Sequence, residues 1–82
     1  MQYSILITGC STGIGLEAAR MLQDRQFLVV ASCRKQKDVD ALKAQGIKHV
    51  VQLDLADSNS IAKGLEETLA ITHGHLFALF NN

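Results

Sequence analysis

Four short, largely apolar stretches recur along the chain, at residues 4–8, 27–32, 49–53 and 75–80. Their apolar residues follow one another without alternating with polar ones, which is typical of strands buried on both faces of a parallel sheet. Stretches with helical spacing separate them. The pattern therefore predicts four strands that alternate with three helices.

The two longer helices are expected at about residues 15–25 and 59–73, and a shorter one follows Asp38. The face of the first helix that packs on the sheet is expected to carry Ile14, Ala18, Met21 and Leu22. The same spacing in the last helix selects Ile61, Leu65, Leu69 and Thr72. Asp38 is expected to cap the short helix, and Ser58 or Asp57 the last one.

The order β-α-β-α-β-α-β with short connections favours an α/β fold with parallel strands and right-handed crossovers. In a Rossmann-type, doubly wound sheet these strands would lie in the order 3-2-1-4. A length of 82 residues allows one small domain.

Composition excludes several classes of protein. The 8 basic residues balance 8 acidic ones and the apolar fraction is 48%, which argues against disorder and against nucleic-acid binding. Neither a membrane-spanning run nor a signal peptide is recognisable. The 2 cysteines have no metal-ligand spacing, and His73 and His75 lack a third ligand, so no metal is expected. We expect a cytoplasmic protein that binds neither nucleic acid nor membrane.

Three glycines lie between the first strand and the first helix, in the pattern Gly9-x-x-x-Gly13-x-Gly15. The first N–H groups of a helix have no backbone partner, and the helix dipole attracts an anion to them. A phosphate can bind there without a basic residue if the backbone comes close. Gly9 would permit the tight turn, Gly13 would keep a Cβ away from a diphosphate, and Gly15 would let the helix approach the strand.

Ser11 and Thr12 add hydroxyl groups to this loop. The alternative is a glycine-rich turn that only packs the helix against the sheet. A P-loop is excluded, because Leu16 and Glu17 follow Gly15 where Lys and Ser or Thr are required.

Residues 8–15, Thr-Gly-Cys-Ser-Thr-Gly-Ile-Gly, resemble the Thr-Gly-x-x-x-Gly-Ile-Gly cofactor motif of the short-chain dehydrogenase/reductase family. Ile14 enters the candidate site through this resemblance. Asp54 and Leu55 resemble the family's Asp-Val/Leu pair, which holds the adenine ring. Asn81 and Asn82 resemble the start of its Asn-Asn-Ala-Gly motif. The resemblance extends over the whole chain.

The resemblance implies that residues 1–82 are a truncated NAD(P)-binding Rossmann domain that ends inside the Asn-Asn-Ala-Gly motif. The catalytic Ser and Tyr-x-x-x-Lys of the family lie beyond the fourth strand. The chain's one tyrosine, Tyr3, precedes the first strand, and Ile7 stands where the lysine would follow. Hydride transfer between nicotinamide and a carbonyl or secondary alcohol is therefore expected only of a longer form, which would also bind the small-molecule substrate.

The end of the second strand distinguishes NADP(H) from NAD(H), because a carboxylate there binds the ribose 2′-hydroxyl and repels a 2′-phosphate. The neutral Cys33 occupies this position and is followed by Arg34 and Lys35. Arginine presents a planar fork to phosphate, and lysine adds a second charge. We expect NADP(H) to be preferred, with NAD(H) possible. The alternative is that both cations belong to a solvated loop.

Two other functions stay open: a non-catalytic dinucleotide-binding module, and a truncated, inactive gene product. The apolar fourth strand would also form an edge open to self-association. The residues expected to bind the cofactor are Gly9, Ser11, Thr12, Gly13, Ile14, Gly15, Cys33, Arg34, Lys35, Asp54, Leu55, Asn81 and Asn82.

Overall fold

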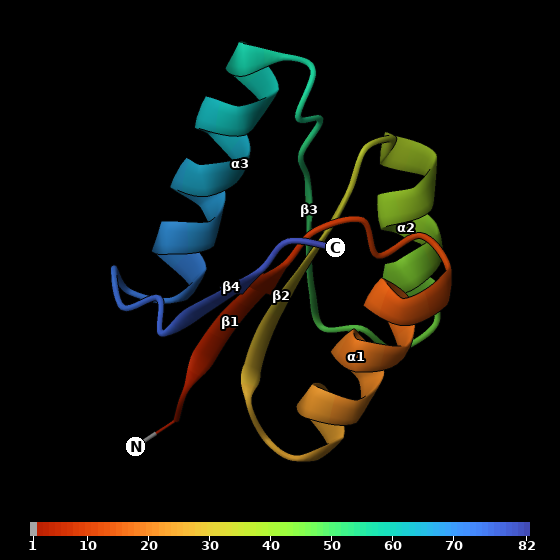
Figure 1. The fold of residues 1–82 in the computed structure, drawn as a ribbon, viewed down its shortest axis with the longest axis vertical. Helices are drawn as coiled ribbons and strands as arrows, with labels where there is room; N and C mark the ends of the chain where they lie inside the picture. Colours follow the sequence, from red (N-terminus) through yellow and green to blue (C-terminus); the bar gives the residue numbers. More distant parts are fainter. Residues whose placement is uncertain (1) are drawn as a thin grey trace.

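A computed structural model describes residues 2–82, which form four strands that alternate with three helices (Figure 1). The strands are β1 (Ser4–Ile7), β2 (Leu28–Cys33), β3 (His49–Gln52) and β4 (Ala78–Phe80). The helices are α1 (Gly13–Asp24), α2 (Gln36–Ala44) and α3 (Ser58–Ile71). None of these helices is long and apolar enough to cross a bilayer.

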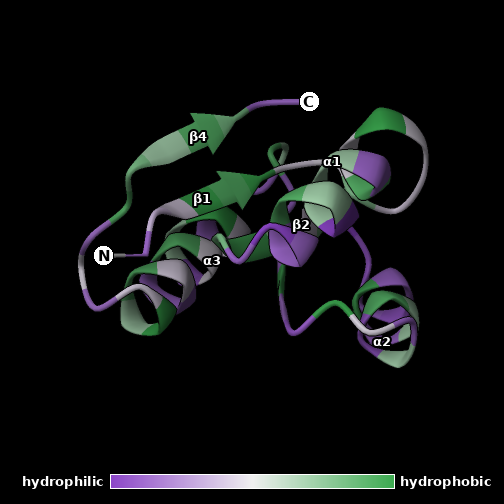
Figure 2. Cartoon of the chain, turned by 90° about the horizontal axis from the view of Figure 1, so that it is seen from below, coloured by the Kyte–Doolittle hydropathy of each residue, from purple (hydrophilic) through white to green (hydrophobic). Residues whose placement is uncertain are grey.

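All strand pairs are parallel, and the order is β3-β2-β1-β4, which confirms the predicted sheet. Helices α1 and α2 cover one face and α3 covers the other (Figure 1). Residues of β1 and β2 alternate between the two layers, so both central strands are mostly apolar (Figure 2), and their polar residues Ser4 and Ser32 are buried. Leu6 and Val30 face α3, while Ile7 and Val29 face α1 and α2.

The edge strand β4 is shorter than the sequence predicts, because regular pairing with β1 begins only at Ala78. Before it, the Phe77 N–H donates to the Ser4 carbonyl at 3.0 Å. Phe77 and Leu79 are 66% and 61% exposed. The fourth strand is therefore an apolar edge in the described structure.

Two helix starts differ from expectation. Thr12 is the N-cap of α1, so this helix begins at Gly13 inside the glycine motif. Lys35 is the N-cap of α2, and the prediction that Asp38 caps it was wrong. Asp38 lies instead in the first turn, where a negative charge suits the helix dipole. For α3 the predicted cap is confirmed: the Asp57 side chain accepts hydrogen bonds from the N–H groups of Asn59 and Ser60.

The predicted inner faces of α1 and α3 were partly wrong. Ile14 is 72% exposed, and Met21, Leu65 and Leu69 also lie at the surface. The residues buried within the two helices are small ones: Gly15, Ala19, Gly64 and Thr68. Hydrophobic spacing selected large side chains, but both helices approach the sheet too closely for them at these positions.

Gly64 shows how close this approach is. A Cβ on it would lie 2.9 Å from the Gln52 carbonyl oxygen and 3.1 Å from the Leu53 side chain. Real Cβ atoms do not approach a backbone oxygen so closely, so α3 would have to move away from β3. The glycine that weakens the isolated helix therefore permits its packing.

Replacing Gly64 with alanine should destabilise the fold by about 1–3 kcal/mol, because the overlap outweighs the gain in helix propensity. Urea unfolding followed by circular dichroism measures this. Glu66→Ala, on the exposed side of the same helix, is the control and should change the stability by less than about 0.5 kcal/mol. A Gly64→Ala protein as stable as the parent would contradict the close packing.

Candidate nucleotide-binding site

The carboxyl ends of the strands bring four separate parts of the sequence to one end of the sheet. A cleft of about 320 Å³ there is lined by Thr8, Gly9, Arg34, Leu53, Asp54, Leu55, Ala56 and Asn82. The cleft adjoins the ends of β1 and β4. The strands β2 and β3 lie on one side of β1 and β4 lies on its other side, so the strand order reverses at β1. Such a switch in strand order is where open α/β sheets bind ligands.

The glycine loop has the backbone that the sequence predicts. Gly9 and Gly13 adopt φ angles of +66° and +68°, a left-handed region that other residues seldom occupy. A Cβ on Gly15 would lie 2.7 Å from the Gly9 carbonyl oxygen, so α1 packs directly against the turn that follows β1. A Cβ on Gly13 would meet no protein atom within 4 Å. Gly13 is therefore open on its outer side.

The amino terminus of α1 has no side-chain cap. Thr12 is extended, and its hydroxyl makes no capping hydrogen bond. This differs from α3, whose first N–H groups are bound by Asp57. Ser11, Thr12, Gly13 and Ile14 are all exposed. The first N–H groups of α1 thus lack the side-chain partner that α3 has, beside an open glycine, which is the arrangement that fits a diphosphate.

Asn81 and Asn82 join the end of β4 to the glycine loop. The Thr8 hydroxyl donates to Asn81 Oδ1 at 3.0 Å and accepts from the Asn82 N–H at 3.1 Å. Asn82 Nδ2 donates to the Gly9 carbonyl at 3.0 Å. Both asparagines therefore use side-chain groups to hold the loop in place, a role that their position in the sequence does not reveal.

Asp54 and Leu55 form the wall of the cleft that follows β3. Asp54 Oδ1 accepts a hydrogen bond from the Ala56 N–H at 3.0 Å, and the Asp54 N–H donates to Ser60 Oγ at 2.9 Å. The carboxylate thus orders its own turn. Leu55 is exposed and presents an apolar surface to the cleft.

Cys33, Arg34 and Lys35 are adjacent in sequence but differ in environment. The Cys33 side chain is 1% exposed and lies in the core between the sheet and the helices α1 and α2, so its thiol faces away from solvent. Arg34 is exposed and lines the cleft. Lys35 is exposed at the start of α2 and is not part of the cleft lining.

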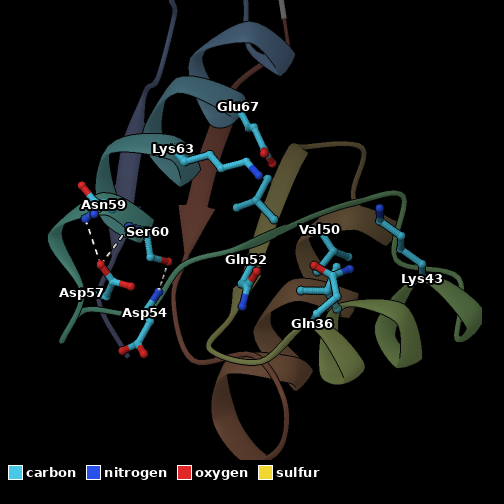
Figure 3. Close-up of a pocket in the computed structure, with 12 residues that line it drawn as sticks. Gln36, Lys43, Val50, Gln52, Asp54, Asp57, Asn59, Ser60, Lys63 and Glu67 are labelled. Atoms are coloured by element: carbon cyan, nitrogen blue, oxygen red, sulfur yellow. Dashed lines mark hydrogen bonds between the residues drawn. The ribbon is translucent and has the colours of Figure 1, made fainter.

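A second, polar pocket of about 320 Å³ lies beside β3 between α2 and α3 (Figure 3). Gln52 stands in its middle, and its Nε2 donates to the Arg34 carbonyl at 3.2 Å. Sequence reasoning did not select Gln52, because only the strand register, in which it lies opposite Cys33, places it beside the β2–α2 turn. Within residues 2–82, no three His, Cys, Asp or Glu side chains gather as metal ligands would.

Both cysteines are free and buried. Burial raises the pKa of Cys10, whose thiol donates to the Ile7 carbonyl at 3.1 Å. Burial and the neighbouring Cys10 raise the pKa of Cys33 to about 11. Since the thiolate is the reactive form, these are inert thiols in the folded chain.

The native protein should therefore react with a thiol reagent such as DTNB at pH 8 only as fast as it unfolds. Rapid labelling at pH 8 without denaturant would contradict the burial of the thiols.

The stability of the fold should also depend on pH. A thiol with a raised folded-state pKa stabilises the fold below its unfolded pKa, near 9, and that stability is lost as the pH rises toward 11. Urea unfolding should therefore give a lower free energy of unfolding at pH 10.5 than at pH 8.

Comparison with known proteins agrees with this geometry. Residues 3–82 match the family model described as short chain dehydrogenase. The chain is 44% identical over its full length to the uncharacterised oxidoreductase YbbO of Escherichia coli (strain K12), and it covers 30% of that protein. It is 37% identical over 89 aligned residues to estradiol 17-beta-dehydrogenase 1 of Rattus norvegicus, covering 95% of this chain and 25% of that protein.

Solved structures show the same fold. Menthone neomenthol reductase from Mentha piperita superposes with a TM-score of 0.84 at 27% identity, covering all of this chain and 31% of that one. The chain thus spans between a quarter and a third of the length of these proteins. The strand order, the glycine turn and the family match together show that the chain belongs to the short-chain dehydrogenase/reductase family.

Proposed function

We propose that this chain binds NADP(H) and is the cofactor-binding part of a short-chain oxidoreductase. The observation that carries the proposal is the uncapped amino terminus of α1 beside Gly13, whose outer side is open. Because the chain spans 30% of the length of YbbO, hydride transfer to or from a carbonyl or secondary alcohol is proposed for a protein of the relatives' length. The nicotinamide of the bound cofactor supplies or accepts that hydride.

The residues present have distinct tasks toward the cofactor. The backbone N–H groups at the start of α1 would hold the diphosphate, with the hydroxyls of Ser11 and Thr12 beside it. The exposed Ile14 side chain would pack against the cofactor beside the diphosphate. Asp54 and Leu55 would form the wall against the adenine ring.

The preference for the 2′-phosphate rests on Arg34. It lines the cleft, and it follows a strand end where Cys33 offers no carboxylate to repel the phosphate. Lys35 adds a second positive charge nearby. Because the Cys33 thiol is turned into the core, Cys33 would contribute its backbone and its lack of charge.

Replacing Gly13 with alanine should abolish measurable NADPH binding, because the added Cβ enters the space of the diphosphate rather than the protein. The same change at Gly74 is the matched control: it has a φ of +78° against +68° for Gly13, and it too meets no atom within 4 Å. Both variants should lose about 1 kcal/mol of stability. Isothermal titration calorimetry distinguishes them. Equal binding by the two variants would contradict the proposed diphosphate site.

Replacing Arg34 with alanine should weaken NADPH about 10- to 150-fold, since a hydrogen bond to a charged group contributes about 1.5–3 kcal/mol. The affinity for NADH should stay within about twofold, because NADH has no 2′-phosphate to lose a partner. Lys37→Ala, in the first turn of α2, is the control and should leave both affinities unchanged. A parent chain that binds the two cofactors equally would refute the NADP(H) preference.

A further inference from the structure

Gln52, the last residue of β3, links that strand to the turn that carries Arg34. Its Nε2 donates to the Arg34 carbonyl oxygen at 3.2 Å, across 18 residues of sequence. Figure 3 shows Gln52 between the side chains that come from α3 and those that come from α2. This places a side-chain donor at the backbone of the residue that the proposed function makes responsible for the 2′-phosphate.

The backbone on both sides of Arg34 is fixed in a different way. The Cys33 carbonyl accepts from the Leu53 N–H at 2.9 Å, which continues the pairing of β2 with β3. The Lys35 carbonyl accepts the first hydrogen bonds of α2, from the N–H groups of Asp38 and Val39. Arg34 lies between strand and helix, outside both ladders, and its carbonyl is held by a side chain instead.

Holding this carbonyl restricts the direction in which the arginine leaves the main chain. The Arg34 side chain keeps its own rotamers, but each of them then starts from the same Cα–Cβ direction. Gln52 itself lines the pocket beside β3 and not the cleft that Arg34 lines. Any effect of Gln52 on the 2′-phosphate must therefore pass through Arg34.

We propose that Gln52 is a positioning residue for NADP(H) recognition: its amide fixes the Arg34 backbone so that the guanidinium points toward the 2′-phosphate. This rests on the proposed NADP(H) preference. Gln52 is exposed at the end of an edge strand, so replacing it disturbs no core contact.

The test is a double-mutant cycle on cofactor preference. Dissociation constants for NADPH and NADH are measured by calorimetry for the parent chain, Gln52→Leu, Arg34→Ala and the double variant. Gln52→Leu should reduce the NADPH preference about 2- to 10-fold, the range of one neutral hydrogen bond, with NADH affinity unchanged. In the Arg34→Ala background the same substitution should have no effect on the preference.

Gln23→Leu is the matched control. Gln23 also bridges two segments, donating to the Gly46 carbonyl at 2.8 Å and accepting from the Lys48 N–H at 3.0 Å, but it lies away from the cleft. It should lower thermal stability and leave the preference unchanged. Melting curves verify that each variant is folded.

The outcomes separate the two proposals. If Arg34→Ala loses the preference while Gln52→Leu retains it in full, the positioning role is overturned and the NADP(H) proposal stands. An equal effect of Gln52→Leu with and without Arg34 also overturns the positioning role. A parent chain without preference overturns the NADP(H) proposal itself, and this inference with it.

Discussion

The close approach of α1 to the turn after β1 is the constraint on which the rest of this structure depends. Gly15 lies so near the Gly9 carbonyl that any Cβ would overlap it, and Gly9 reaches that position only through a left-handed backbone. The helix therefore begins over the end of the central strand, with Thr12 leaving its first N–H groups without a side-chain cap. The packing that buries one side of α1 thus leaves its amino terminus exposed, which is where the proposed function places the diphosphate.

The cleft is completed from two directions. On the β4 side, Asn82 donates hydrogen bonds to Thr8 and Gly9 at the end of the neighbouring strand β1. On the β3 side, Asp54 orders its own turn, and Gln52 holds the backbone of Arg34. Residues that resemble a cofactor motif in sequence, such as Asn82 and Asp54, thus order the loops around the cleft, and the Arg34 and Leu55 side chains that line it are exposed.

Local patterns predicted the strands and the glycine turn, because each depends on residues adjacent in sequence, and the strand order followed from the general rule for doubly wound sheets. The inner helix faces were harder to predict. Hydrophobic spacing favoured Met21 and Leu65, whereas the fully buried residues of these helices are small ones such as Ala19 and Gly64. Contacts between distant segments, such as Gln52 with Arg34, could not be predicted, since they follow from strand register rather than from any motif.

The most direct test of this account is an NMR titration of the ¹⁵N-labelled chain with NADPH, observing each backbone amide. If the amino terminus of α1 binds the diphosphate, the amides of residues 12–15 should show the largest shifts, and those at the start of the capped helix α3 should stay in place. Binding that leaves the amides of residues 12–15 unshifted would contradict the central claim.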